Sequence, residues 1–174
     1  LFWDDTCPSL EGMHVRAGNA DAGVMLDFKT RMPAGQSVDQ RLKMPRWMNE
    51  FEGRGGKLLI QDVDLETVER LADQSDLLLV ATGKGELGKL FERDTARCQF
   101  DAPQRITALT YVHGMKQRED FGAVNINVNP GVGEFVHFPG LTHTGPCDII
   151  NIESIIGGPM DRWDGVKTPE QHLA

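Results

Sequence analysis

The residues best suited to carry chemistry are the glycines that follow an apolar run near the middle of the chain. The run covers residues 76–81, Thr82 follows it, and Gly83, Gly85 and Gly88 then complete the spacing G-x-G-x-x-G. Glycines at this spacing after a strand let backbone amides and a helix N-terminus approach a pyrophosphate. One interpretation of the segment is therefore a phosphate-binding loop.

A second interpretation places the same segment in the late strand of a flavoprotein nucleotide domain, with the first glycine loop elsewhere in the chain. A dinucleotide loop requires a second strand about 20 residues on that ends in an acidic residue. Pro103 interrupts that region, and the next apolar stretch, residues 106–112, ends in His113-Gly114. We favour the second interpretation, and an ordinary buried strand and turn is the third.

The histidine, serine and cysteine residues form no recognisable metal or hydrolase motif. The five histidines are dispersed, and Gly145-Pro146 separates His143 from Cys147, which argues against a helical metal site. No serine has the context of a nucleophile elbow. We therefore expect no metal, and we assign no catalytic side chain.

Composition narrows the class of protein. A net charge of −8 argues against a nucleic-acid partner, because phosphate contacts need a basic face. A hydrophobic content of 40% is enough for a core without disulfides, and three widely separated cysteines fit reduced thiols in a cytoplasmic protein. No run reaches transmembrane length, so we expect no membrane partner. Both ends of the sequence look cut, since it begins in mid-pattern and stops soon after Thr168-Pro169-Glu170, where a helix should begin.

The first hundred residues predict a hairpin followed by alternating helices and strands. Short alternations over residues 12–29 flank a glycine-rich tip at 18–23, and Pro33-Ala34-Gly35 should end the hairpin. Residues 37–56 have helical spacing, with Ser37 as a cap and Pro45 as a bend. A short strand at 57–60, a helix capped by Asp64 and a strand at 77–80 buried on both faces should follow.

The last third of the chain has the pattern of an antiparallel sheet with one wet face. Residues 104–112, 123–129, 134–138 and 147–152 alternate polar with apolar side chains, and Asn129-Pro130-Gly131 is a strong turn signal. The predicted fold class is α/β plus β, an antiparallel sheet with part of a Rossmann-like domain. The predicted divisions are a hairpin at 1–35, an α/β segment at 36–99, and a sheet with the start of a C-terminal helix at 100–174.

One long segment resembles a known family. Residues 38–57 match the pattern Val-Asp-x-Arg-Leu-x-x-Pro-Arg-x-Met-x-x-Phe-Glu-x-Arg-Gly-Gly-Lys of the styrene monooxygenase epoxidase component. The resemblance continues through residues 76–80, 83–84, 87–89 and 103–105. It implies a two-component system, in which a separate NADH-dependent reductase reduces FAD and a flavin hydroperoxide epoxidises an aryl alkene. The reactive atom in such a system belongs to the cofactor.

The resemblance also implies site residues. It places Arg41 near the phosphate and ribityl side of FAD, Val63 near the adenine, and Thr82-Gly83 at a strand end near the cofactor. His14 falls near the substrate side, and an apolar wall would contain Met25, Phe28 and Val128. The family's early glycine loop and its late Gly-Asp segment are not found among these residues.

Together these observations predict the substrate-binding region of a FAD-dependent monooxygenase that acts on a small aromatic compound. The chain by itself should be inactive and should bind FAD weakly or not at all. The alternative is a non-catalytic ligand-binding or association module derived from a flavoprotein fold. A homodimer is left open.

Overall fold

The computed structural model describes residues 2–3, 5–83, 85–116 and 122–173. These residues belong to two compact units. Leu1–Asn49 and Ala102–Ala174 form the first unit, and Glu50–Asp101 form the second. The division falls within helix α1 (Gln40–Gly53), so the start of this helix belongs to the first unit.

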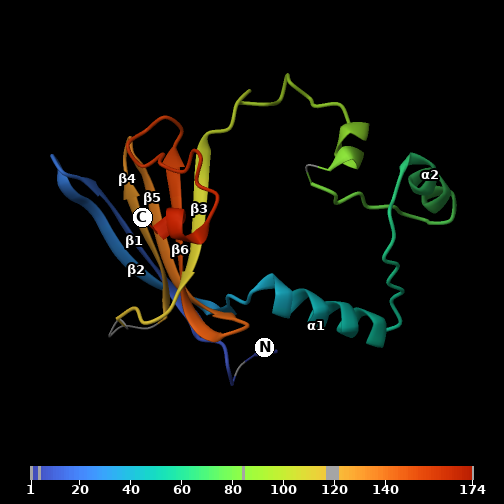
Figure 1. Ribbon diagram of the computed structural model, residues 1–174, viewed down its shortest axis with the longest axis horizontal. Helices are drawn as coiled ribbons and strands as arrows, with labels where there is room; N and C mark the ends of the chain where they lie inside the picture. The colour runs from blue at the N-terminus through green and yellow to red at the C-terminus, as the bar shows by residue number, and fades with distance from the viewer. Residues whose placement is uncertain (1, 4, 84, 117–121, 174) are drawn as a thin grey trace. The chain divides into compact units, whose positions relative to one another are not determined.

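The first unit contains one six-stranded sheet. Its strands are β1 (Ser9–Asn19), β2 (Gly23–Gln36), β3 (Arg105–Val112), β4 (Ala123–Asn129), β5 (Gly133–Thr142) and β6 (Gly145–Ile155). They lie in the order β2-β1-β4-β5-β6-β3 (Figure 1). The strands predicted after residue 103 are all present, so this part of the fold is confirmed.

The sheet is mixed. The four strands after residue 103 pair antiparallel as predicted, and the predicted hairpin joins them through a parallel pair. β1 pairs with β4 in parallel, from Gly12 opposite Ala123 to Ala17 opposite Val128. The other neighbouring strands are antiparallel. Parallel neighbours need a long connection, and the whole second unit lies between β1 and β4 in the sequence. The hairpin is therefore an integral part of the sheet.

Local turn chemistry accounts for two of the connections. In the β1–β2 turn the Asn19 side-chain oxygen accepts hydrogen bonds from the backbone N–H groups of Asp21 and Ala22, at 3.1 and 2.7 Å. In the β4–β5 turn Gly131 has a φ of +79°, a conformation that glycine adopts without strain. Both turns lie where the sequence predicts them.

β2 continues beyond its predicted end. It runs through Pro33 to Gln36, although proline cannot donate a hydrogen bond to a neighbouring strand. The proline is tolerated because β2 is an edge strand, where one row of backbone groups has no strand partner. A register shift also occurs in this pair, between Leu10 and Gly12.

The helices follow the predicted spacing, with one change of cap. Asp39 caps α1, because its side chain accepts from the backbone N–H of Arg41 at 2.8 Å and its carbonyl accepts from Leu42 and Lys43. Ser37, the predicted cap, instead accepts from the backbone N–H of Leu141. Asp64 caps α2 (Leu65–Asp73) as predicted. A 3-10 helix, η1 (Glu86–Leu90), and α3 (Pro169–Leu173) complete the elements.

The strands predicted at 57–60 and 77–80 do not form. Neither segment has strand geometry, and Leu77 and Leu79 are 75% and 80% exposed. A buried strand needs neighbours for its backbone groups and for both faces, and the described part of the second unit contains no strand. The prediction of a buried parallel strand at 77–80 is therefore wrong for this structure.

A small core joins the sheet to the start of α1. Cys7, Val38 and Leu141 are buried together, and Trp3 and Leu42 pack against them. Asp39 donates its backbone N–H to the carbonyl of Leu141 at 2.8 Å. Within the described ranges, no helix is long and apolar enough to cross a membrane.

Candidate functional site

A row of polar side chains crosses one face of the sheet. His14 on β1 lies opposite Asn125 on β4, and Asn125 lies opposite His137 on β5. Directly paired residues share a face, and alternate residues along a strand do as well. The alternation in the sequence therefore places all three side chains on the same face. His14 and Asn125 are each 5% exposed.

Each histidine of the row is bonded to a carboxylate. His14 Nε2 lies 2.7 Å from Asp27 Oδ1, and His137 Nε2 lies 2.8 Å from Asp148 Oδ1. The bond from His14 is the main cause that lowers the pKa of Asp27 below its ordinary value. Arg16 adds to it, with Nε 3.1 Å from the other oxygen of Asp27. The His137–Asp148 pair is the more enclosed, with side chains 14% and 12% exposed.

Asn125 occupies the middle of the row. Its Nδ2 donates to the carbonyls of Ala123 and His137, at 2.9 and 3.5 Å. Its Oδ1 is buried and has no hydrogen-bond partner among the described residues. A buried acceptor without a partner costs free energy, so this amide favours any occupant or water that can donate to it.

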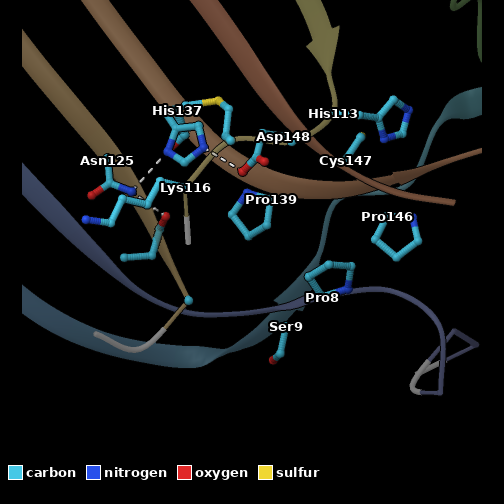
Figure 2. Close-up of a pocket in the computed structure, with 14 residues that line it drawn as sticks. Pro8, Ser9, His113, Lys116, Asn125, His137, Pro139, Pro146, Cys147 and Asp148 are labelled. Atoms are coloured by element: carbon cyan, nitrogen blue, oxygen red, sulfur yellow. Dashed lines mark hydrogen bonds and ion pairs between the residues drawn. The ribbon is translucent and has the colours of Figure 1, made fainter. Parts of the chain in front are cut away.

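A pocket of about 280 Å³ opens beside the His137–Asp148 pair. Figure 2 shows the His137 ring between the side chains of Asn125 and Asp148. Three prolines supply rigid apolar walls, and the lining side chains that can titrate are His113, Lys116, His137, Cys147 and Asp148. His14 and Asp27 do not line this pocket.

Two of the lining groups have defined local roles. His113 Nε2 lies 3.0 Å from Thr144 Oγ1, a contact that ties the end of β3 to the β5–β6 turn. Burial raises the pKa of the Cys147 thiol above its ordinary value, and the Asp148 charge adds to this effect. A thiol with a raised pKa stays protonated at neutral pH and is a poor nucleophile. Cys147 therefore acts as a small apolar wall residue.

The four predicted substrate residues do not meet at one place. Phe28 is paired with Val15, and Val128 with Ala17, so both lie on the face opposite His14. Met25, at the register shift of the hairpin, is 65% exposed, and Phe28 is 43% exposed. The structure thus brings Phe28 and Val128 onto one apolar face and places His14 on the polar face.

The predicted cofactor residues are divided between the two units. Arg41 belongs to the first unit, and its side chain is 70% exposed and paired with Asp39 at 2.6 Å. Val63, Thr82 and Gly83 belong to the second unit and are exposed. Each unit therefore contains only part of the predicted set.

The glycines at 83–88 form a local turn, of which residue 84 lies outside the described residues. Gly85 donates its N–H to Thr82 at 3.1 Å, and Gly88 donates to Gly85 at 2.9 Å. A Cβ at position 88 would lie 2.7 Å from the Gly83 carbonyl oxygen, so the turn has room only for glycine at this position. Because these amides are engaged and only a five-residue 3-10 helix follows, the turn does not fit a bound pyrophosphate.

Metal-ligating side chains are not gathered in the described ranges, where no group of three or more His, Cys, Asp and Glu residues could hold an ion. The pocket is lined by side chains that can form hydrogen bonds and accept protons.

Comparison with known proteins gives the family. The sequence profile of the styrene monooxygenase A substrate-binding domain matches residues 83–174, more than half of the chain. The chain belongs to this family. The matched residues include β3 to β6, and with them His137, Asp148 and most of the pocket.

Two curated relatives support the same assignment. Styrene monooxygenase StyA of Pseudomonas fluorescens is 37% identical over 126 residues, and StyA of a Pseudomonas species is 36% identical over the same length. Each alignment covers 72% of this chain and 30% of the relative. The chain thus spans about a third of the length of these relatives, and the predicted family is confirmed.

Sequence reasoning missed the pocket residues of this styrene monooxygenase family member. His137 and Asp148 are 11 positions apart on two strands, and only the register of β5 against β6 brings them together. The available signal was the polar alternation at Asn125, Asn127 and Asn129 in β4, which marks the face that carries the site.

Proposed function

We propose that this chain is the substrate-binding region of a FAD-dependent monooxygenase that epoxidises or otherwise oxygenates a small aromatic alkene. The observation that supports the proposal most directly is the family match, because it covers the strands that carry most of the pocket. The activity, substrate and partners of the full-length relatives come to this chain only as part of the proposal.

The role of the chain in this proposal is to bind and enclose the aromatic compound. Reduced FAD, when bound, would activate molecular oxygen, from which one atom is transferred to the substrate. An apolar enclosure favours such chemistry because it excludes water. The pocket beside β5 and β6 would supply the enclosure, and Phe28, Val128 and Met25 would form an apolar wall outside it, with Phe28 and Val128 on the sheet face opposite His14.

The flavin contacts are proposed residue by residue. Arg41 would approach the phosphate and ribityl side, Val63 the adenine, and Thr82-Gly83 would come near the cofactor. Because the turn at 83–88 does not fit a pyrophosphate, the phosphate site of the cofactor would lie outside it. A separate NADH-dependent flavin reductase would supply reduced flavin, in the cytoplasm, and a homodimer stays part of the proposal.

A non-catalytic ligand-binding or association module is the second candidate. It is favoured by one observation, that the N–H groups of Gly85 and Gly88 are already bonded within the turn and so do not face a phosphate. Such a module would bind an aromatic compound in the pocket and would not respond to flavin.

The test uses the full-length gene product that contains these residues. It is mixed with FAD, NADH, an NADH-dependent flavin reductase and styrene, and the products are separated by gas chromatography. Formation of styrene oxide that requires both proteins is the expected result. Reductase alone and the 174-residue chain with reductase are the controls. If the full-length protein binds styrene yet forms no oxygenated product, the module is the correct function.

A further inference from the structure

We propose that the pocket beside β5 and β6 binds an aromatic compound that carries a phenolic hydroxyl group, and that His137 accepts the phenolic proton. Asp148 is the positioning residue that holds the imidazole ring. The inference names the substrate class of the same region and so rests on the proposed function for the role of the bound compound.

The orientation of His137 leaves one ring nitrogen available. Nε2 is engaged with Asp148 at 2.8 Å, so Nε2 carries the proton when the ring is neutral and donates it to the carboxylate. Nδ1 then holds a lone pair, and it has no hydrogen-bond partner among the described residues. The ring lines the pocket, and we infer that this nitrogen accepts the proton of an occupant.

The charges around the pocket suit an anion formed in place. Lys116 lines the same pocket and has no carboxylate partner in the described part of the chain, and His113 lines it as well. Among the described lining residues the only carboxylate is Asp148, which His137 already engages. A phenolate would therefore find a cation in the lining and an imidazolium balanced by Asp148.

The size and walls of the pocket suit a single ring. Its volume of about 280 Å³ lies near the lower end of ligand pockets, which run from about 300 to 1,000 Å³. Pro8, Pro139 and Pro146 provide apolar surface without donors. Asn125, whose Oδ1 is buried without a partner among the described residues, also lines the pocket.

The proton step is balanced within the pocket. The phenolic O–H bond breaks, a new N–H bond forms at His137 Nδ1, and the electron pair stays on the phenolate oxygen. No oxidant is consumed. A phenolate ring is richer in electrons than a phenol or a plain alkene, so it reacts more readily with an electrophilic oxygen donor. Proton acceptance by a positioned side chain is the usual form of general base catalysis.

The test follows the ionisation of a bound probe and needs no flavin. The 174-residue chain is titrated with 4-nitrophenol between pH 5 and pH 9, and the yellow colour of the anion reports its ionisation. We expect the ionisation midpoint of the bound probe to fall by about one pH unit relative to the free probe. The other groups that face the probe are His113, Lys116 and Cys147, with His14 and Asp27 farther along the row.

Variants separate proton acceptance from packing. His137→Gln keeps a hydrogen-bond donor toward Asp148 and removes the base, so the shift in the ionisation midpoint of 4-nitrophenol should disappear. The same variant should bind 4-nitroanisole, which has no proton to lose, with an affinity within about threefold of wild type. Asp148→Asn should reduce the shift, and Asp148→Glu should restore part of it. Glu153→Gln, an acid-to-amide change on the opposite face of the same strand, is the control and should keep the shift.

Near-ultraviolet circular dichroism confirms that each variant is folded. The proposal is overturned if 4-nitrophenol does not bind, if its midpoint is the same bound and free, or if His137→Gln keeps the shift. A failed epoxidation test with a normal shift would contradict the proposed oxygenase alone. A normal epoxidation test with no shift would contradict the phenolic substrate class alone.

Discussion

Replacing Asp39 with asparagine should remove an ion pair while keeping a helix cap. Asp39 is 6% exposed, and its carboxylate accepts hydrogen bonds from three donors of Arg41. These donors are the backbone N–H at 2.8 Å, Nε at 3.1 Å and Nη2 at 2.6 Å. These bonds are the main cause that lowers the pKa of Asp39 from 3.8 to about 2. Asparagine caps a helix as well as aspartate does, so Asp39→Asn tests the charge.

The expected magnitude follows from this pKa. The fall from 3.8 to about 2 corresponds to about 2.4 kcal/mol, at about 1.36 kcal/mol for each pH unit. The Arg41 side chain is 70% exposed, so solvent screens the pair, and we expect Asp39→Asn to lower the free energy of unfolding at pH 7 by about 1 to 2 kcal/mol. The folded pKa lies below the unfolded one, so this contribution is complete above about pH 5 and is lost as the pH falls toward 2.

Urea unfolding followed by tryptophan fluorescence measures this difference at pH 7 and pH 3. About half of it should be gone at pH 3. The control is Asp64→Asn, an exposed cap of α2 that accepts a backbone N–H and is not bonded to an arginine; it should have the smaller effect. Equal stability of Asp39→Asn and wild type at pH 7, or a difference unchanged at pH 3, would refute the reasoning.

Three further predictions concern the turn, the cofactor and the single tyrosine. In urea unfolding, Gly133→Ala should lower the free energy of unfolding by about 3 kcal/mol, because the new Cβ would lie 2.5 Å from the Glu153 carbonyl oxygen. The control Gly131→Ala, at a φ of +79° with open space around the Cβ, should lower it by about 1 kcal/mol. Calorimetric titration of the chain with FAD should show no binding at micromolar affinity, which needs about 8 kcal/mol; tighter binding would show that Gly83 to Gly88 is a phosphate loop after all. Burial is the main cause that raises the pKa of Tyr111, and the Asp39 charge is the second. Tyrosinate absorbance should therefore appear only above about pH 10, and at a lower pH in Asp39→Asn. An unchanged midpoint in that variant would contradict an effect of the Asp39 charge on Tyr111.

Local chemistry in the sequence predicted the elements whose causes are themselves local. Asn129-Pro130-Gly131 fixes a turn whatever surrounds it, and Asp64 caps α2 through a bond to Thr67 three residues away. The family resemblance likewise depended on a continuous run of residues. These predictions were confirmed because each depends on neighbours along the chain.

The parts that sequence reasoning missed depend on residues far apart. Nothing within β1 or β4 specifies that Gly12 lies beside Ala123 in parallel, since period-2 alternation fits either direction. The apolar run at 77–80 has the composition of a buried strand, but whether such a run is paired depends on strands outside it. The contact between His137 and Asp148 depends on the register of β5 against β6. A slip of one residue would place the two side chains on opposite faces of the sheet.

The parallel pair β1–β4 also sets the order in which the protein can fold. β1 and β2 can pair as soon as both have left the ribosome, and β4, β5 and β6 can pair as a local meander. Within the sheet the two halves pair through β1 and β4, after the whole segment 50–101 has been synthesised. Non-local pairing of this kind is slow, and the waiting edge of β1 is open to other strands. A cut within 50–101 would therefore leave two pieces with complementary edges, able to reassemble as a split protein.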